Sequence, residues 1–280
     1  MAKALAYAYD DWCISIFADS LGEMAIGNKY SRFSKAYEFY FDESVRFMRG
    51  LDSKGKWRTP FNPSSSNHRN DDYCEGTAWQ WTWFVPHDIE GLVNLMGGEA
   101  PFAEKLDSLF TASSKLEGAV VSSDISGLIG QYAHGNEPSH HIIHLYNYVN
   151  QPSKTQALID SVLVSQYTDQ PDGLSGNEDC GQMSAWYVLN AMGFYQVCPG
   201  KPVYSIGRPL HKQAKIHLPN GRTFTIKAIN NSETNKYIQS VQLNGKAIVT
   251  PFFTHHDLER GGVLEITMTN HPTSWGIKKN

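Results

Sequence analysis

The sequence predicts a mainly α-helical body, residues 1–198, followed by a small antiparallel β region, residues 199–280. Two observations lead to this division. Through the first two thirds of the chain, apolar residues recur at the spacings of three and four that are typical of helices. From Lys201 onward, short runs of β-branched and aromatic residues flank Asn-Gly pairs, a pattern typical of β-hairpins.

The helical pattern predicts about eight helices. They cover residues 1–21, 29–40, 88–95, 101–113, 123–132, 139–149, 153–167 and 180–192. Residues 50–70, rich in Gly, Ser, Pro and Asn, are expected to form a long loop, and long loops in compact proteins are often functional.

The β region contains two hairpin signals and one further strand. Asn220-Gly221 separates residues 215–218 from 223–228, and Asn244-Gly245 separates 237–243 from 246–249. The further strand is expected at residues 262–268.

Charge and composition exclude several classes of protein. The 280 residues carry a formal net charge of -4, so nucleic acid is not an expected partner. No apolar run approaches the roughly 20 residues of a membrane span, and the start is too short and too soon interrupted for a signal peptide. The four Cys lack the paired spacing of a zinc ribbon or of a dense disulfide framework. We therefore expect a soluble chain.

Aromatic residues are frequent and clustered. Seven Trp and fourteen Tyr accompany only 19% charged residues, and Trp79, Trp81 and Trp83 fall within five positions. Flat aromatic rings stack on the C–H faces of sugars as well as filling cores. The composition thus favours a carbohydrate ligand.

The first of three polar stretches runs from Asp71 to Asp88 and contains Glu75. Aromatic residues precede and follow Glu75, so its carboxyl group could lie in apolar surroundings, where loss of water raises the pKa of an acid. A carboxyl that stays protonated can donate a proton. The alternative is an acid in the first turn of a helix, favoured by the helix dipole.

The second stretch reads HGNEPSHH, residues 134–141. Asn136 and Glu137 offer hard oxygen ligands in a turn, which suits calcium. His140 and His144 have the i, i+4 spacing of a zinc pair on a helix, but the Glu of an HExxH motif is absent, which disfavours zinc. The alternative is a plain turn before a helix.

The third stretch, LSGNEDCGQMSAW, places Glu178 and Asp179 between glycines at residues 174–186. Asp179 stands three residues before Gln182 at the start of a helical pattern, the arrangement of a capping box. Gly193 suits the end of that helix. Asp179 is therefore a candidate N-cap, a candidate general base, or both, because a helix N-terminus keeps a carboxylate ionised.

Two carboxylates on separate loops with aromatics between them are the equipment of a glycoside hydrolase. One protonates the leaving oxygen, and the other activates water or attacks the sugar. A calcium-dependent, lectin-like carbohydrate-binding protein needs the same aromatics and ligands but no acid–base pair. A helical scaffold that carries these loops by accident is a third interpretation.

Five segments resemble glycoside hydrolase family 92 and occur in the family's order over nearly the entire chain. They are YAYDDWCI, EGTAWQWTWFVPHDIEGL, HGNEPSHH, GLSGNEDCGQMSAWYVLNAMGFYQVCPG and YSIGRPL. The resemblance implies a calcium-dependent exo-α-mannosidase that inverts the anomeric configuration, with an (α/α)6 toroid around the site.

The resemblance also implies roles for residues. Glu75 would be the general acid and Asp179 the general base, with Glu178 as the alternative base or a sugar neighbour. Calcium would lie at Asn136 and Glu137. The same match adds Gln80 to the calcium ligands, and Trp79, His87, Asp88, His140 and His141 to the sugar neighbours.

Two departures from the family pattern qualify this resemblance. Some relatives have a second carboxylate where Asn177 stands. About eight helices are too few for a complete toroid, and the β-sandwich expected before it is missing. We therefore expect this chain to be the C-terminal part of a longer enzyme, whose N-terminal part would be its partner. The exposed faces of the first helices would then be apolar. The isolated chain would be weakly active or inactive. The parent enzyme would be periplasmic or extracellular.

Overall fold

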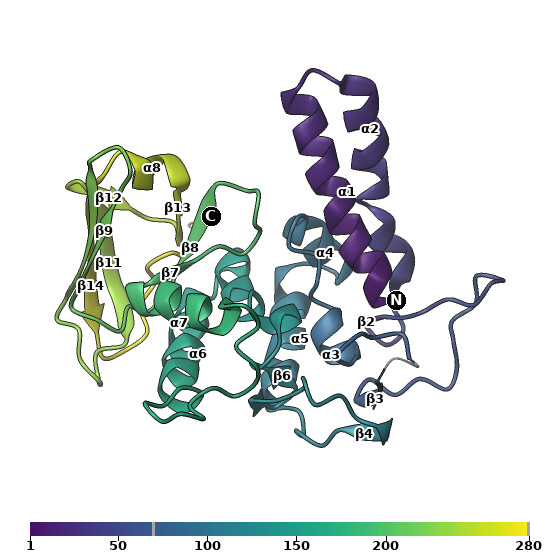
Figure 1. Cartoon of the computed structure of the whole chain (residues 1–280). Helices are drawn as coiled ribbons and strands as arrows, with labels where there is room; N and C mark the ends of the chain where they lie inside the picture. The colour runs from purple at the N-terminus through teal and green to yellow at the C-terminus, as the bar shows by residue number, and fades with distance from the viewer. Residues whose placement is uncertain (69–70, 279–280) are drawn as a thin grey trace. The chain divides into compact units, whose positions relative to one another are not determined.

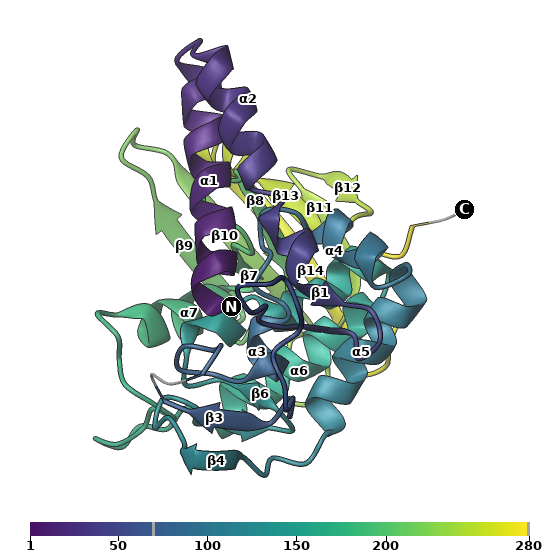
Figure 2. The same cartoon turned by 90° about the vertical axis from the view of Figure 1, so that its right-hand side faces the viewer.

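The computed structural model describes residues 1–68 and 71–278, which form two compact units, Met1–Ser139 and His140–Asn280. Figures 1 and 2 show the chain from two directions. Residues 69–70, the last two positions of the expected long loop, lie outside the described residues. These units are defined by how compactly their residues pack, which does not test the predicted boundary between a helical body and a β region. The boundary at residue 198 stays a prediction.

The first unit begins with two helices that lie side by side, α1 (Ala2–Ser20) and α2 (Met24–Phe33) (Figures 1 and 2). Gly22 joins them with a φ of +81°, a conformation that side chains disfavour. Gly27 is buried against the side chain of Asp19 and leaves no room for a Cβ atom. The two helices therefore approach closely.

The outer faces of α1 and α2 carry exposed apolar side chains, as expected from the sequence. Phe17 is 66% exposed and Leu21 is 64% exposed. Further exposed apolar residues on the pair are Tyr7, Ile14, Ile16, Met24, Ile26 and Phe33. Within residues 1–68 and 71–278, no helix is both long and apolar enough to cross a membrane.

The rest of the first unit combines short helices with two-stranded sheets. The helices are η1 (Ala36–Tyr40), α3 (Ala78–Trp81), α4 (Ile89–Leu95), α5 (Glu99–Thr111) and η2 (Glu137–Ser139), where η denotes a 3-10 helix. The antiparallel pairs are β1 (Phe41–Asp42) with β2 (Phe47–Met48), and β5 (Leu128–Ile129) with β6 (Tyr132–Ala133). The parallel pair is β3 (Ser65–Asn67) with β4 (Glu117–Val120).

The second unit contains helices and two larger sheets. The helices are η3 (Ile142–Val149), α6 (Pro152–Ser165), α7 (Gln182–Met192) and α8 (His255–Glu259). One sheet has the order β12 (Lys246–Ile248), β11 (Tyr237–Leu243), β14 (Gly262–Thr269), β10 (Thr223–Ile229), β9 (Gln213–His217). The other has the order β13 (Phe252–Thr254), β8 (Val203–Ile206), β7 (Phe194–Tyr195).

Both predicted hairpins are confirmed. Strands β9 and β10 pair antiparallel, with His217 opposite Thr223. Strands β11 and β12 pair antiparallel around Asn244 and Gly245, whose φ values of +52° and +77° are those that a type I′ turn requires.

Alternate residues of the central strands build the core of the five-stranded sheet. Because side chains in a strand point to opposite faces, every second residue of β10 and β14 is buried on one side. The buried set includes Phe224, Ile226, Ile238, Val241, Leu264, Ile266 and Met268, together with Phe194 and Phe253.

The predicted mainly α fold class is wrong. The chain is 36% helical and 21% strand, with five sheets among the described residues. Part of the error is the expected helix 123–132, which forms turns and the β5–β6 pair. Gly130 there has a φ of +60°, and a Cβ at this position would collide with the carbonyl of Leu109. Helix geometry is therefore unavailable at this position.

Three further expectations need correction. The expected helix 29–40 is divided into α2 and η1, and the expected α-helix 139–149 is the 3-10 helix η3. The β region is not purely antiparallel, because β10 and β14 run parallel, with Phe224 opposite Gly262. A parallel pair needs a long crossover, and here the crossover contains β11, β12, β13 and α8.

We predict that Phe224→Ala lowers the free energy of unfolding by about 3–5 kcal/mol, because it leaves a cavity in a fully buried position. Val249→Ala is the matched control, since Val249 is 72% exposed and should change stability by less than about 0.5 kcal/mol. Urea unfolding followed by tryptophan fluorescence measures both. Equal losses in the two variants would contradict the proposed core.

Candidate active site

Hydrogen bonds hold the loop that carries Glu75 on both sides. Before it, the Asp71 carboxylate accepts the backbone N–H groups of Asn67 at 2.6 Å and Tyr73 at 2.9 Å. After it, Thr77 caps α3. Glu75 itself has a φ of +51°, in the left-handed region. A non-glycine residue held there by its neighbours is the kind of strain found at functional sites.

Asn136 fastens the Glu75 loop to the HGNEP turn. Its Nδ2 donates to the Glu75 carbonyl at 2.9 Å and lies 3.5 Å from Glu75 Oε2. Asn136 is buried, whereas Glu75 is exposed. The structure thus brings the expected acid together with one expected calcium ligand, but the apolar surroundings expected for the Glu75 carboxyl are not found among the described residues.

Gln80, another expected calcium ligand, is already engaged. Its Oε1 accepts the backbone N–H of Thr77 at 2.6 Å and the Thr77 hydroxyl at 2.9 Å, which completes a capping box at the start of α3. Its Nε2 donates to the Gln131 carbonyl at 2.5 Å. Because the two lone pairs of Oε1 are used, Gln80 does not fit a metal ion in this conformation.

The HGNEP turn itself fits a hard cation better. The Ser139 N–H donates to the Asn136 carbonyl at 3.2 Å, which closes the turn, and the Glu137 side chain is exposed. Asn136 Oδ1 accepts no hydrogen bond within residues 1–68 and 71–278. In the same residues no three His, Cys, Asp or Glu side chains gather as metal ligands. A cation here would rely on Asn136 Oδ1, the Glu137 carboxylate and oxygens from outside the protein.

Trp79 is half-buried and held by three neighbours. Its Nε1 donates to Ser64 Oγ at 3.2 Å, and its ring meets the Phe47 ring edge-on at 4.8 Å. Lys105 Nζ lies 4.8 Å from the ring centroid. Since Ser64 belongs to the predicted long loop, Trp79 joins that loop to α3.

His87 and Asp88 have structural contacts. His87 is buried, with Nε2 2.9 Å from a backbone carbonyl. Asp88 caps α4 by accepting the Gly91 N–H at 3.1 Å, and its carboxylate also binds Lys35 Nζ and the Tyr37 hydroxyl. Burial raises the pKa of Asp88, but these hydrogen bonds outweigh burial and lower it below its ordinary value. The sugar contacts expected of both residues stay predictions.

In the second unit, the Asp179 loop enters α7 through three left-handed residues. Asp179, Cys180 and Gly181 have φ values of +52°, +55° and +97°. Gly181 is the N-cap of α7, and no side chain caps at that position. The predicted capping box of Asp179 and Gln182 is therefore wrong. Gly193, at a φ of +101°, ends the helix as predicted.

Glu178, rather than Asp179, satisfies the start of α7. Its carboxylate accepts the Ser184 N–H at 3.1 Å and the Ser184 hydroxyl at 2.9 Å. The Asp179 carboxylate is partly exposed and makes no hydrogen bond or ion pair with the described residues. Of the two adjacent acids, Asp179 is the one that remains available for chemistry.

His140 is held against the start of α7. Gln182 Nε2 lies 3.0 Å from His140 Nδ1, and Trp186 Nε1 donates to the His140 carbonyl at 2.9 Å. The structure thus places one expected sugar neighbour beside the helix that follows Asp179. His141, also buried, is the N-cap residue of η3.

His144 belongs to a buried hydrogen-bonded group that the sequence did not reveal. Its Nε2 lies 2.9 Å from Asn190 Oδ1, and its Nδ1 lies 3.0 Å from Ser205 Oγ. Burial lowers the pKa of His144 to about 4, although the bond to Asn190 opposes this shift. The ring is neutral near pH 7, and both nitrogens are used. The one available signal was Asn190, a polar residue within an apolar helical pattern.

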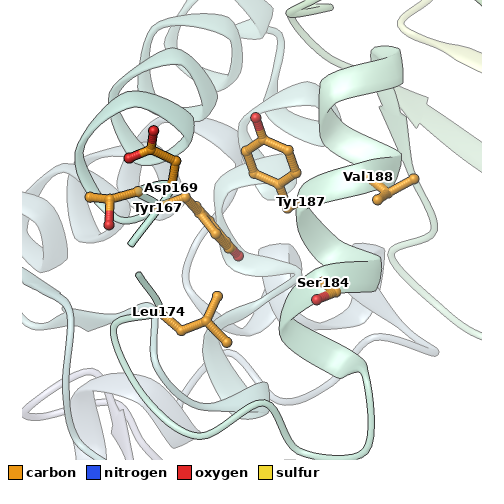
Figure 3. Close-up of a pocket in the computed structure, with 7 residues that line it drawn as sticks. Tyr167, Asp169, Leu174, Ser184, Tyr187 and Val188 are labelled. Carbon is orange, nitrogen blue, oxygen red and sulfur yellow. The ribbon is translucent and has the colours of Figure 1, made fainter. Parts of the chain in front are cut away.

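A pocket of about 390 Å³ adjoins the Asp179 loop (Figure 3). Ser184, Tyr187 and Val188 line it from α7, and the Tyr187 ring points toward Tyr167 in the segment after α6. Ser184 is also the residue that Glu178 binds. The remaining lining residues are Tyr167, Thr168, Asp169 and Leu174.

The family follows from comparison with known proteins. Residues 1–270 match the glycosyl hydrolase family 92 catalytic domain. This chain belongs to glycoside hydrolase family 92. Glu75 and Asp179, each on a left-handed turn before a helix, are therefore two carboxylates in a chain of a glycosidase family.

Relatives of known structure agree with the family. A family 92 α-mannosidase of Bacteroides thetaiotaomicron, solved with mannoimidazole, is 38% identical with a TM-score of 0.93 over 99% of this chain and 37% of its own. A family 92 inverting mannosidase of Bacteroides thetaiotaomicron VPI-5482 is 40% identical with a TM-score of 0.87, over 99% of this chain and 38% of its own.

A curated relative from Arthroderma benhamiae, described as an uncharacterized secreted glycosidase, is 28% identical over 303 residues, covering 100% of this chain and 37% of the relative. The chain thus spans well under half the length of these relatives.

We predict that His144 makes this family 92 chain sensitive to acid. The folded-state pKa of about 4 lies below the ordinary histidine value of 6.5, so the unfolded chain binds the proton more tightly. Stability is therefore lost as pH falls from about 6.5 toward 4, by up to about 3 kcal/mol. His144→Gln should flatten this dependence in urea unfolding, whereas the exposed His211→Gln should not. The same slope in all three proteins would contradict the assignment.

Proposed function

We propose that the enzyme containing this chain hydrolyses terminal α-linked mannose from oligosaccharides or N-glycans, with inversion and with the help of calcium. Membership of family 92 and the mannosidase activity named for relatives at 38% and 40% identity support the substrate. One of these relatives is named an inverting mannosidase, which supports inversion.

The observation that carries the proposal is the conformation of the two carboxylates. Glu75 and Asp179 are both non-glycine residues at left-handed φ angles, and each precedes a helix start that other side chains cap. Backbone strain has a free-energy cost and persists where the surroundings enforce it, often for a function.

In the proposed reaction, Glu75 protonates the glycosidic oxygen while Asp179 takes a proton from the attacking water. Water then adds to the face of the sugar opposite the leaving group, which inverts the anomeric carbon. Such a reaction needs the two carboxyl groups about 6.5–9.5 Å apart, so that the water fits between Asp179 and the sugar. The capping role of Glu178 supports Asp179 as the base.

Calcium, in this proposal, is held by Asn136 Oδ1 and the Glu137 carboxylate. Both are hard oxygen ligands, and water and sugar hydroxyls would supply the rest of the six to eight oxygens that calcium prefers. Bound calcium would orient vicinal hydroxyls and stabilise negative charge. Gln80 is left out, since its amide serves the α3 cap.

The exposed apolar face of α1 and α2 is, we propose, the surface on which the rest of the enzyme packs. Monomeric proteins rarely expose contiguous apolar patches of large area without a partner. Relatives more than twice as long support this, and the chain on its own is expected to be weakly active or inactive. The secreted relative supports export of the parent enzyme.

We predict that Asp179→Asn and Glu75→Gln each lower turnover of α-mannobiose by the full-length enzyme at least about 100-fold, because each removes a proton-transfer group. The exposed Glu90→Gln on α4 is the control and should leave turnover unchanged. NMR of the released sugar measures rate and stereochemistry together, with β-mannose expected first.

Other outcomes decide between interpretations. α-Mannose as the first product would overturn inversion, and undiminished turnover in either variant would overturn its assigned role. Sugar binding by the unmodified enzyme without any turnover would instead favour the calcium-dependent carbohydrate-binding protein.

We predict that calcium raises the melting temperature of this chain, since an ion that binds the folded state stabilises it. Glu137→Gln should weaken the shift by removing the charged ligand, and Glu90→Gln should preserve it. Thermal unfolding after chelation and after calcium addition measures the effect without reference to activity. A calcium shift that survives in Glu137→Gln would place the ion elsewhere.

A further inference from the structure

Lys105, on α5, is a buried lysine whose ammonium group forms no ion pair with a carboxylate of the described residues. The residue is only 8% exposed, and its Nζ makes no ion pair or hydrogen bond with the described part of the chain. Instead, Nζ lies 3.3 Å from the ring centroid of Phe47 and 4.8 Å from that of Trp79. The faces of two aromatic rings stand where a counter-ion would normally be.

Other lysines near aromatic rings are placed differently. Lys29 Nζ lies 5.5 Å from the Tyr30 ring and Lys154 Nζ lies 5.3 Å from the Tyr146 ring, and neither lysine is buried. Burying a charge has a large free-energy cost unless a specific interaction offsets it, so the site of Lys105 is a specific one.

One of the two rings that hold Lys105, that of Trp79, belongs to the candidate active site. Trp79 meets Phe47 edge-on at 4.8 Å and donates to Ser64 at 3.2 Å. Trp79 also lies in the single turn of α3, whose N-cap Thr77 follows the Glu75 loop by two residues. Lys105 is therefore one of three contacts that fix the indole next to the proposed acid.

We infer that Lys105 is a positioning residue, whose ammonium holds the Trp79 indole, and with it the first turn of α3, in the orientation that the sugar site needs. The link to sugar rests on the proposed function. The hold on the indole does not depend on it.

The charge of Lys105 depends on pH in an accessible range. Burial, and to a smaller extent the nearby positive charge of Arg46, together lower its pKa to about 8. Two further charged residues, Asp42 on β1 and Arg49 just after β2, form an ion pair with each other, with 2.6 Å between Arg49 Nη1 and Asp42 Oδ2. The ammonium thus holds the indole below about pH 8 and releases it as the pH rises beyond.

The direct test is an NMR titration of the Trp79 indole N–H in this 280-residue chain, with the resonance assigned through Trp79→Phe. We expect the Trp79 signal to titrate with a midpoint near pH 8. Lys105→Met should abolish that titration, and the matched control Lys154→Met should preserve it. An unchanged titration in Lys105→Met would overturn the inference.

A second variant covers the case in which Lys105→Met does not fold. Arg46→Met keeps Lys105 and both rings but removes the neighbouring positive charge, so the midpoint should move to higher pH. A midpoint that stays in place would contradict the assignment of the titration to Lys105.

Activity separates this inference from the proposed function. In the full-length enzyme, the KM for α-mannobiose should rise above pH 8, because Lys105 loses its charge there. Lys105→Met should raise this KM about five-fold with little change in kcat, and should remove its rise above pH 8. If the unmodified enzyme hydrolyses no mannoside, the proposed function fails while the indole titration still decides the role of Lys105. A KM that matches the unmodified enzyme at every pH would overturn the role of Lys105 in the sugar site.

Discussion

The starts of the helices constrain the whole candidate site, because the first N–H groups of a helix have no partner within it. At α3 these groups use the Gln80 amide, at α4 the Asp88 carboxylate, and at α7 the Glu178 carboxylate. All three residues resemble ligand-binding groups in the sequence. Once the caps are assigned, the side chains left for chemistry are fewer, and they include Glu75, Asp179 and the Asn136–Glu137 turn.

Local signals in the sequence predicted the elements that depend on local interactions. The helices now seen as α1, α5, α6 and α7, and the hairpins at Asn220-Gly221 and Asn244-Gly245, carry their own periodicity and turn residues. The failures depend on distant contacts. Gly130 is fixed by the close approach of the Leu109 carbonyl, and the parallel pairing of β14 with β10 follows from strand order, which no local pattern reports. The mainly α fold class failed in part for the same reason, since β3 pairs with β4 and β8 pairs with β13, partners that lie far apart in the chain.

In the candidate site, too, local features could be predicted from the sequence and distant contacts could not. The sequence indicated which loops carry polar groups and which carboxylates to examine, and the resemblance to family 92 gave them roles. It did not indicate that Glu178 rather than Asp179 would serve α7, because a cap six residues away is not the usual box. Nor did it reveal the contacts of His144 with Asn190 and Ser205, or of Lys105 with Phe47, which join residues far apart in the chain.

The position of β14 in the five-stranded sheet has a consequence for how the protein is made. This strand is the last of the sheet in chain order, yet it lies in the middle, between β11 and β10. During synthesis, β9 with β10 and β11 with β12 can form as separate hairpins, but each keeps an unpaired edge until β14 leaves the ribosome and joins them. Unpaired edges promote association between chains. The interval before β14 emerges is therefore when a nascent chain has most need of a chaperone.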